Sequence, residues 1–548
     1  MIRLAVSAIL PIRHQRCVAA FTLCIFFAAC ASVPARLGSE SGSSFLSSPA
    51  DEWITIRDFR WVAAVGVSER VAYFGTTTGL ERWDTLRQTW LAPLTEADDL
   101  PDDYVTALVA EPLGGDVWVG TRRGLARLSG FDDLVEPVWG PLPAPVETLL
   151  LDPRDGAVYA RIAGTWWSGR SASFSRVAAP PAGPLEGPAE AAELDPARVP
   201  WIDPLYARGA YEPSLFRLTE VDRDLRGDWY AGTWGDNARR WRTGAADWEP
   251  LLFGLAGPSG GPMARAANGY WFAPAARDGD GTAALVHAAP DLGSWSHVVP
   301  REVPELPVAT ATALIAIGDT LIVGSDFGIA WGVGPGWAGS GHADVGRVAA
   351  LAVDGPVLWI GTDDGLLAWD RSARRSVGTA LRAHRINAIV AAPDALFVGA
   401  ADGLWAARRI GPPAATAEAA AVADSLLTVE PRGRAVRALA LHENLLLLAS
   451  DLGVDVFDRA SGAWTSFPIG VGRLVSAPLA LASDGENAWI GTERGLVRWR
   501  IATNEWRDFG PGDGLAGVPV LHLLAERDFV WASTPAGVSR FAWRAAGP

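Results

Sequence analysis

Residues 487–499 read NAWIGTERGLVRW, and versions of this pattern return along most of the chain. Each copy has an apolar stretch around an aromatic residue, a Gly-Thr step, two variable residues, a Gly-Leu step and then alternating residues. The second glycine of the clear copies falls at residues 79, 124, 328, 365, 403, 453, 495 and 537. Most neighbouring copies are therefore about 40 residues apart, which is the length of a four-stranded β-propeller blade.

The chemistry of the pattern agrees with that architecture. Its apolar half is continuous rather than alternating, as in a strand that is buried on both faces. The two variable residues and the glycine after them are typical of a tight turn, because glycine tolerates positive φ. We infer that the glycine before the threonine leaves space where neighbouring blades converge.

Three weaker copies extend the series, namely AVYARIAGTWW (157–167), DWYAGTWGDNARRW (228–241) and GYWFAPA (269–275). Eleven copies can then be recognised. A single ring of that size would exceed the usual ~4–8 blades. We therefore predict an all-β fold of tandem β-propellers, with eleven to twelve four-stranded blades in two rings.

The expected domain boundaries follow from the copies. We expect a first propeller of five to six blades at 51–300 and a second of six blades at 301–548. The stretch 179–214, rich in Pro, Ala and Glu, is an insertion or a degenerate blade. The last copy lacks an outer strand, and residues 52–57 match that missing element. We predict that this N-terminal strand pairs with the C-terminal blade and closes the second ring.

The N-terminus has the features of an export signal. Three arginines precede an apolar run that is too short for a transmembrane helix and ends in Phe-Ala-Ala-Cys at 27–30. This predicts a signal peptide over 1–29, lipidation of Cys30 and a flexible Ser/Gly-rich tether over 30–50. A plain secretory signal is the alternative. Because Ala31 rather than Asp follows the cysteine, we expect a lipid-anchored protein of the bacterial envelope, at the outer membrane and facing the periplasm.

Composition excludes several classes of function. The formal net charge of −15 opposes a nucleic-acid partner, which needs a basic surface. All three cysteines lie at or before Cys30, so no disulfide framework is expected. We find no histidine spacing typical of a metal site, no nucleotide-binding loop and no nucleophile motif. The sequence therefore predicts no cofactor, no metal and no catalytic residue.

The signature W-I-G-T-x-x-G-L, clearest at 359–366 and 489–496, resembles the two-component-regulator propeller repeat. The segments at 98–111 and 512–526 share the resemblance, which covers most of the chain from residue 52 onward. In that family the propellers form the periplasmic sensors of membrane histidine kinases, usually as two tandem rings. This chain has no kinase segment and no later transmembrane segment. The resemblance therefore implies the fold and a binding role, but not signalling by this chain alone.

Acidic residues recur in the turns of the second half of the chain. If the blades share one geometry, these side chains line one rim of a ring, where they could bind a ligand. The alternative is that Asp is simply favoured in turns before glycine. A tryptophan within the turn GTWGDN is a candidate for an exposed stacking contact. The candidate ligand-binding residues are Asp326, Asp363, Asp364, Asp402, Asp451, Glu493, Arg494 and Trp234.

These observations predict a non-enzymatic, lipid-anchored binding module of the envelope, a sensor or scaffold that presents its ring faces to a glycan, peptide or protein partner. One alternative is an envelope polysaccharide lyase or glycosidase that uses rim carboxylates as acid and base. Another is a scaffold for outer-membrane assembly.

Overall fold

The computed structural model describes residues 53–113, 115–171, 173–190, 207–208, 215–216, 218–257, 260–273, 285–298, 311–408, 427–429 and 434–544. This described part is an all-β structure with two short 3-10 turns, η1 (Glu96–Asp98) and η4 (Pro511–Asp513). Within it, no helix is long and apolar enough to span a bilayer. Eleven of its sheets are blades of two propeller rings, and all strand pairs within them are antiparallel.

Four blades form the first ring. An additional short hairpin, β15 (Ala207–Arg208) with β16 (Leu215–Phe216), follows the first strand of the fourth blade. The strands of the four blades are β2 (Val62–Val67), β3 (Val71–Thr76), β4 (Leu80–Asp84), β5 (Thr89–Trp90); β6 (Val105–Ala110), β7 (Val117–Thr121), β8 (Leu125–Leu128), β9 (Val135–Trp139); β10 (Val146–Asp152), β11 (Ala157–Ile162), β12 (Thr165–Gly169), β13 (Phe174–Val177); and β14 (Ala189–Glu190), β17 (Leu218–Arg223), β18 (Trp229–Thr233), β19 (Ala238–Trp241), β20 (Glu249–Leu251).

Seven blades form the second ring, and the last of them takes its outer strand from the beginning of the described chain. Their strands are β21 (Met263–Ala266), β22 (Gly269–Phe272), β23 (Leu285–Ala288), β24 (Trp295–Val298); β25 (Ala311–Ile317), β26 (Thr320–Ser325), β27 (Gly328–Val333), β28 (Ala338–Ala343); β29 (Val348–Asp354), β30 (Val357–Thr362), β31 (Gly365–Asp370), β32 (Arg375–Ala380); β33 (Ile386–Ala391), β34 (Ala395–Ala400), β35 (Gly403–Arg408), β36 (Leu427–Val429); β37 (Val436–His442), β38 (Leu445–Ser450), β39 (Gly453–Asp458), β40 (Trp464–Pro468); β41 (Pro478–Ser483), β42 (Asn487–Thr492), β43 (Gly495–Arg500), β44 (Glu505–Phe509); and β45 (His522–Ala525), β46 (Val530–Thr534), β47 (Gly537–Phe541), β1 (Trp53–Ile56).

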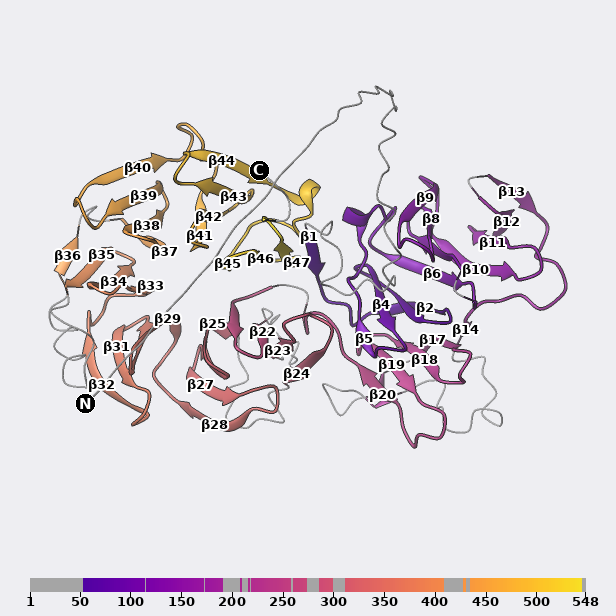
Figure 1. Cartoon of the computed structure of the whole chain (residues 1–548), viewed down its shortest axis with the longest axis horizontal. Coiled ribbons are helices and arrows are strands. Elements are labelled where there is room, and N and C mark those ends of the chain that lie inside the picture. Colours follow the sequence, from indigo (N-terminus) through magenta and orange to yellow (C-terminus); the bar gives the residue numbers. More distant parts are fainter. Residues whose placement is uncertain are drawn as a thin grey trace, which may run out of the picture. The chain divides into compact units, whose positions relative to one another are not determined.

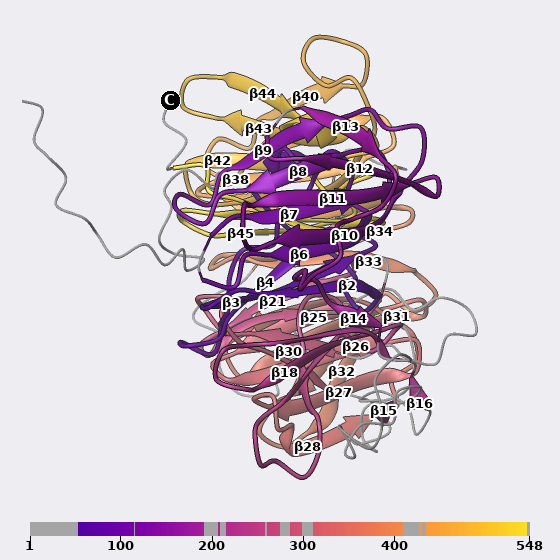
Figure 2. The ribbon, with the colours of Figure 1, turned by 90° about the vertical axis from the view of Figure 1, so that its right-hand side faces the viewer.

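Contacts between innermost strands define each ring. In the first ring β2 contacts β6 and β17, and β6 contacts β10. Leu151 of β10 and Glu186 each donate a backbone hydrogen bond to the other, which joins β10 to the segment that leads into β14. Figure 2 shows β10, β11, β12 and β13 side by side in chain order. In the second ring the innermost strands β25, β29, β33, β37, β41 and β45 surround a common centre, and β21 contacts both β25 and β45 (Figure 1).

This grouping differs from the expected division near residue 300. The blade β21–β24 belongs to the second ring because β21 lies between β45 and β25. The described part of the first ring therefore has four blades rather than five to six, and the second has seven rather than six. In the stretch 179–214, β14 pairs with β17 and adds a fifth strand to its blade.

The predicted ring closure is confirmed. β1 pairs with β47 along its whole length, in the register Trp53 to Phe541 through Ile56 to Val538 (Figure 1). The ring of Trp53 stacks on that of Phe541 with their centroids 4.5 Å apart. Since β1 precedes the first ring and β21 follows it, the first ring is an insertion within the second.

The glycine of the Gly-Thr step sits where one blade meets the next. A Cβ atom at Gly361 would lie 2.6 Å from Cγ2 of Ile386, the first residue of the next innermost strand. Real Cβ atoms essentially never approach so closely. The inferred role of this glycine is therefore confirmed. The same close pairing recurs for Gly75 with Val105, Gly120 with Val146, Gly232 with Val62, Gly324 with Val348, Gly399 with Val436 and Gly491 with Val520.

Glu81 in β4 is a buried carboxyl group of the first ring. Its residue is 0% exposed, and neither carboxylate oxygen has a hydrogen-bond partner in the described structure. Loss of hydration raises the pKa of Glu81 well above its ordinary value, and the nearby charge of Asp58 adds to this shift. Two other blades place Leu367 and Val497 at the same strand position.

We expect Glu81→Leu to raise the free energy of unfolding at pH 8 by about 1–3 kcal/mol, the typical cost of a buried unsatisfied polar group. The folded pKa lies above the unfolded value of about 4.3, so the folded state holds more protons between the two values. The wild-type protein therefore loses stability as the pH rises through this window, whereas the variant does not. Denaturant titrations at pH 4 and pH 8 measure the difference, and an equal gain at both values would contradict the prediction.

Candidate functional site

Most acid-bearing turns of the second ring are held by a hydroxyl side chain after the repeat glycine, which is Thr362, Thr492, Ser325 or Ser450. Thr362 accepts a hydrogen bond from the backbone N–H of Asp364 at 3.2 Å and donates one to the carbonyl of Gly365 at 2.9 Å. Gly365 has a φ of 137°, which other residues rarely adopt. Thr492 makes the same two bonds in the turn that carries Glu493. The turn residues therefore stand at defined positions, with Asp363 exposed to solvent.

We use the name second-ring rim for the turns between the second and third strands of each second-ring blade, together with the connections that enter the next blade. The two parts are in contact. The backbone N–H of Ile469, in a connection, donates to the carbonyl of Leu452, in a turn, at 3.0 Å. Val520 likewise donates to the carbonyl of Thr492 at 2.9 Å. Turns and connections thus form one continuous surface.

An alternating chain of charges runs along this rim across three blades. Arg347 Nε lies 2.9 Å from a carboxylate oxygen of Asp326 in the preceding turn. The same guanidinium reaches Asp363 at 3.3 Å, and Asp363 in turn lies 3.3 Å from Nε of Arg385. Each arginine directly precedes an innermost strand, β29 or β33. Two of the predicted acids are therefore neutralised by arginines of the connections.

Asp402 is also partnered. Its carboxylate lies 2.8 Å from Nδ1 of His384, whose ring packs edge-on against Trp405 with centroids 5.0 Å apart. The four remaining candidates on this rim are exposed, and in the described structure their own side chains make no ion pair and no hydrogen bond. They are Asp364, Asp451, Glu493 and Arg494.

The basic partners were missed by the sequence analysis, although the sequence contains a signal for them. Arg347 stands directly before Val348, and Arg385 directly before Ile386. These β-branched residues are the ones that pack on the Gly-Thr glycine of the preceding blade. An arginine that repeats at one position of the repeat, beside a repeated acid in the turn, indicates pairing between the two positions.

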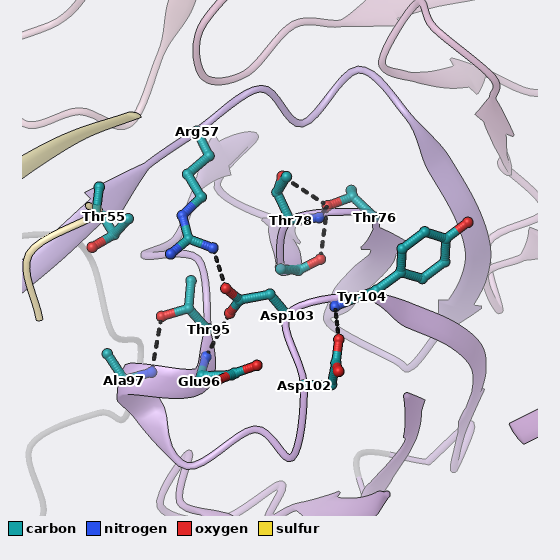
Figure 3. A network of polar contacts seen from close by, with 12 residues as sticks. Thr55, Arg57, Thr76, Thr78, Thr95, Glu96, Ala97, Asp102, Asp103 and Tyr104 are labelled. Carbon is teal, nitrogen blue, oxygen red and sulfur yellow. Dashed lines mark hydrogen bonds and ion pairs between the residues drawn. The ribbon is translucent and has the colours of Figure 1, made fainter. Parts of the chain in front are cut away.

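The first ring has the same arrangement with the charges exchanged. Arg123, in a turn, binds Asp102 of the adjacent connection at 2.6 Å and also Glu96. Figure 3 shows the continuation of this network, in which Arg57, directly after β1, pairs with Asp103. The other oxygen of Asp103 accepts the backbone N–H of Glu96 at 2.7 Å. The closing strand of the second ring is thus tied to a first-ring connection.

Trp234 is partly exposed, as predicted for a stacking contact, but it is not isolated. Its residue is 41% exposed and its ring meets that of Trp61 edge-on, with centroids 5.5 Å apart. The two residues also form an isolated backbone bridge. Trp61 precedes β2, so this pair repeats the contact between a turn and the connection beside it.

A small polar cavity of about 170 Å³ lies where innermost strands of the first ring end. Asp222, at the end of β17, accepts the backbone N–H of Val67 at 2.7 Å. Burial raises the pKa of Asp222 to about 6. Glu220 similarly accepts the N–H of Val65 at 2.9 Å. Both carboxylates therefore satisfy backbone donors of β2, which is a structural role.

The second-ring rim also exposes apolar side chains. Phe327 is 64% exposed and Leu452 is 49% exposed. Both occupy the second position of the turn, where three other blades have Asp364, Asp402 and Arg494. Further exposed apolar residues lie in the connections. They are Val471, Val475, Val518 and Leu521. Within the described second ring, Val333 is the one large exposed apolar residue at the opposite strand ends.

Comparisons with known proteins bear on the fold. No protein-family model and no curated protein matches the chain. A solved structure of PorZ, described as an essential bacterial surface component of the type-IX secretion system of Porphyromonas gingivalis, is similar over 89% of this chain and 87% of its own. The sequence identity is 14% and the TM-score is 0.52. The chain shares the fold of PorZ.

A second similar structure is the extracellular domain of the hybrid two-component system BT4673 from B. thetaiotaomicron. It is 14% identical, with 88% of this chain and 70% of that domain covered and a TM-score of 0.41. Cys30, the predicted lipidation site, lies outside the described residues.

Proposed function

We propose that this protein is a non-enzymatic binding module of the bacterial cell envelope, lipid-anchored at Cys30, whose second-ring rim binds a protein partner. The observation that carries the proposal is the combination of exposed apolar side chains with exposed charges on that rim. Apolar residues surrounded by polar ones are the composition of protein interfaces. Because hydrogen bonds of Ser325 and Ser450 hold the turns of Phe327 and Leu452 in place, little ordering entropy would be lost on binding.

The alternating row of charged side chains on the second-ring rim supports a role in recognition rather than in stability. Exposed ion pairs such as those of Asp363 contribute only about 0–1 kcal/mol each. An alternating row of charges, however, selects a partner with complementary charges and disfavours others. A glycosidase-like use of the rim has less support, because Asp326, Asp363 and Asp402 are already engaged by arginine or histidine.

The proposal can be tested by affinity capture from detergent-solubilised envelopes, with the full-length chain as bait. We expect the double variant Phe327→Ser/Leu452→Ser to lose a protein that the wild-type chain retains. Val333→Ser is the matched control, because it removes an exposed apolar side chain from the opposite strand ends. Equal recovery with the rim variant and the control would refute the proposed binding surface.

Charge reversal tests the contribution of the acids. The variant Asp363→Lys/Asp402→Lys should reduce recovery of the same protein, because each lysine would face an arginine or histidine and invert the local charge pattern. Its stability should fall by less than about 1 kcal/mol per pair, since both carboxylates are solvent-exposed. Thermal unfolding measures the second expectation. Unchanged recovery would limit the interface to the apolar residues.

A second candidate function is that of a scaffold in envelope assembly. The fold shared with PorZ, a surface component of a secretion system, favours it. The captured protein would decide, since a component of a secretion or assembly complex would support this function.

A further inference from the structure

A cavity of about 210 Å³ lies between the second and third blades of the second ring, β25–β28 and β29–β32. It is distinct from the rim, because Ile317 and Thr320 flank the turn between the first and second strands, at the opposite strand ends. Its walls are mostly apolar, and Arg371 and Arg374 enter from the turn between β31 and β32. The remaining lining residues are Ile322, Ile329, Trp331, Leu358 and Trp369.

The cavity arises from a departure in the repeat. Counted from the turn glycine, β27 carries Gly332 where β31 carries Trp369 and β43 carries Trp499. Trp337 folds back over Gly332 and fills that place. Trp331 instead takes the position that holds Ala368 in β31, and its ring lies 6.5 Å from that of Trp369. The two indoles are tilted by 48° to each other, and both line the cavity at the junction between the blades.

Among the described residues, no carboxylate lies within ion-pair distance of the guanidinium of Arg371 or of Arg374. The guanidinium of Arg374 lies 5.2 Å from the centre of the Trp331 ring. Nε of Arg371 and Nε1 of Trp331 are buried donors, and neither has a hydrogen-bond partner in the part of the chain that the structure describes. Buried donors of this kind are unfavourable unless an acceptor is supplied.

The equivalent arginine two blades further on shows the difference. Arg459 occupies the position of Arg371, six residues after the turn glycine, and it pairs with Asp394 of the preceding blade. Asp319 is the counterpart of Asp394 beside the cavity. It is exposed and makes no ion pair with Arg371. The positive charge at Arg371 is therefore left available to a ligand.

The backbone at Arg374 has the conformation that this turn adopts in several blades. Its φ of 51° lies in the left-handed region, as does φ at the corresponding residues of four other blades, Gln88, Trp337, Gly462 and Asn504. The carboxylate of Asp370 holds the turn by accepting the N–H groups of Ser372 and Ala373 at 2.8 and 2.9 Å. The turn thus fixes a cation above an indole at the mouth of an apolar cavity.

We propose that this cavity binds a carboxylate carried on an aromatic or apolar body. The body would lie in the cavity against the indoles of Trp331 and Trp369, and the carboxylate would accept hydrogen bonds from Arg371 and Arg374, whose planar guanidinium groups match carboxylate geometry. Two sources share this chemistry. One is a free aromatic acid, and the other is the C-terminus of a peptide that ends in an aromatic residue.

Isothermal titration calorimetry of the full-length chain in detergent tests the proposal with two pairs of probes. Indole-3-acetate is compared with indole-3-acetamide, and a pentapeptide ending in Phe is compared with its C-terminal amide. We expect the carboxylate form of at least one pair to bind at least tenfold more tightly than its amide. Binding of indole-3-acetate assigns the site to small acids, whereas binding of the peptide alone assigns it to C-termini.

Substitutions then locate the site. Arg374→Asn suits the left-handed backbone, so it should leave the melting temperature unchanged or raise it while lowering affinity at least tenfold. Arg371→Gln should also weaken binding at least tenfold. Arg375→Gln, which removes a neighbouring exposed arginine outside the cavity, should bind as the wild-type protein does. Equal affinity for acid and amide, no binding of either carboxylate at millimolar concentration, or unchanged affinity in both cavity variants would overturn the proposal.

Discussion

Gly361→Val is expected to lower the free energy of unfolding of the second ring by about 1–3 kcal/mol or more, the usual cost of overpacking a core. Even the first added atom, Cβ, would lie 2.6 Å from Cγ2 of Ile386 and 3.0 Å from its Cβ. Neither atom is the end of a flexible chain, so the blades themselves would have to move apart. By strand propensity alone the same change would be favourable, because valine is preferred over glycine in strands. A loss of stability would therefore be due to the contact between the blades and not to strand propensity.

Thermal unfolding followed by circular dichroism measures this change. Gly336→Val is the control, because no atom lies within 4 Å of a Cβ built at Gly336 and its φ is outside the left-handed region. A double-mutant cycle with Ile386→Ala adds a second test, since removing Cγ2 should relieve part of the clash. The double variant should then be more stable than the sum of the single effects predicts. Strict additivity would show that the clash is absorbed elsewhere.

The repeat could be predicted from the sequence because every blade meets the same packing problem. Gly361 and Ile386 belong to a pair that recurs with glycine and a β-branched residue at most junctions, so the pattern is visible without a structure. The closing strand could be predicted for a related reason. Trp53 matches Trp506 in an outer strand, and one blade lacked such a strand. Both predictions rest on residues that can be recognised by comparing equivalent positions of the repeat.

The division of blades between the rings could not be predicted in the same way. The copy at 269–275 lacks the Gly-Thr step, so its sequence carries little information about its neighbours. Its place is decided by contacts of β21 with β25 and with β45, a strand that begins 259 residues after the start of β21. Contacts over such distances leave no periodic signal in a single sequence.

The candidate site was predicted in part. The acids of the second-ring rim were found because they share a turn position, whereas their partners lie in connections of variable length. Arg347 is 21 residues from Asp326 in the chain. The cavity beside Trp331 was not predicted, for a different reason. A shift of one residue in β27 reverses which face of the strand carries the indole, and only the neighbouring blade shows what that face meets.

Removal of residues 53–57 is expected to have the largest effect of any change considered. We expect the free energy of unfolding to fall by at least about 5 kcal/mol. β1 buries Ile54 and Ile56 almost completely, and truncation of one such side chain typically costs about 2–5 kcal/mol. Trp53 adds its stacking on Phe541 and its edge contact with Phe509. A loss of this size is comparable to the whole stability of a typical domain, about 5–15 kcal/mol. The deleted chain should therefore lose its ordered last blade or fail to fold.

Hydrogen exchange separates these outcomes from a merely local effect. In the deleted chain the amides of β47 would lose their partners in β1, and protection should fall first in β45, β46 and β47 and then in the adjoining blades. Ile56→Ala provides a milder variant that remains folded and should destabilise by about 2–5 kcal/mol. A synthetic peptide of residues 51–57 added in trans should restore protection of β47, because it supplies the missing edge strand. Wild-type protection of β47 in the deleted chain without the peptide would mean that the ring closes without its first strand, and the insertion of one ring within the other would then contribute nothing to its stability.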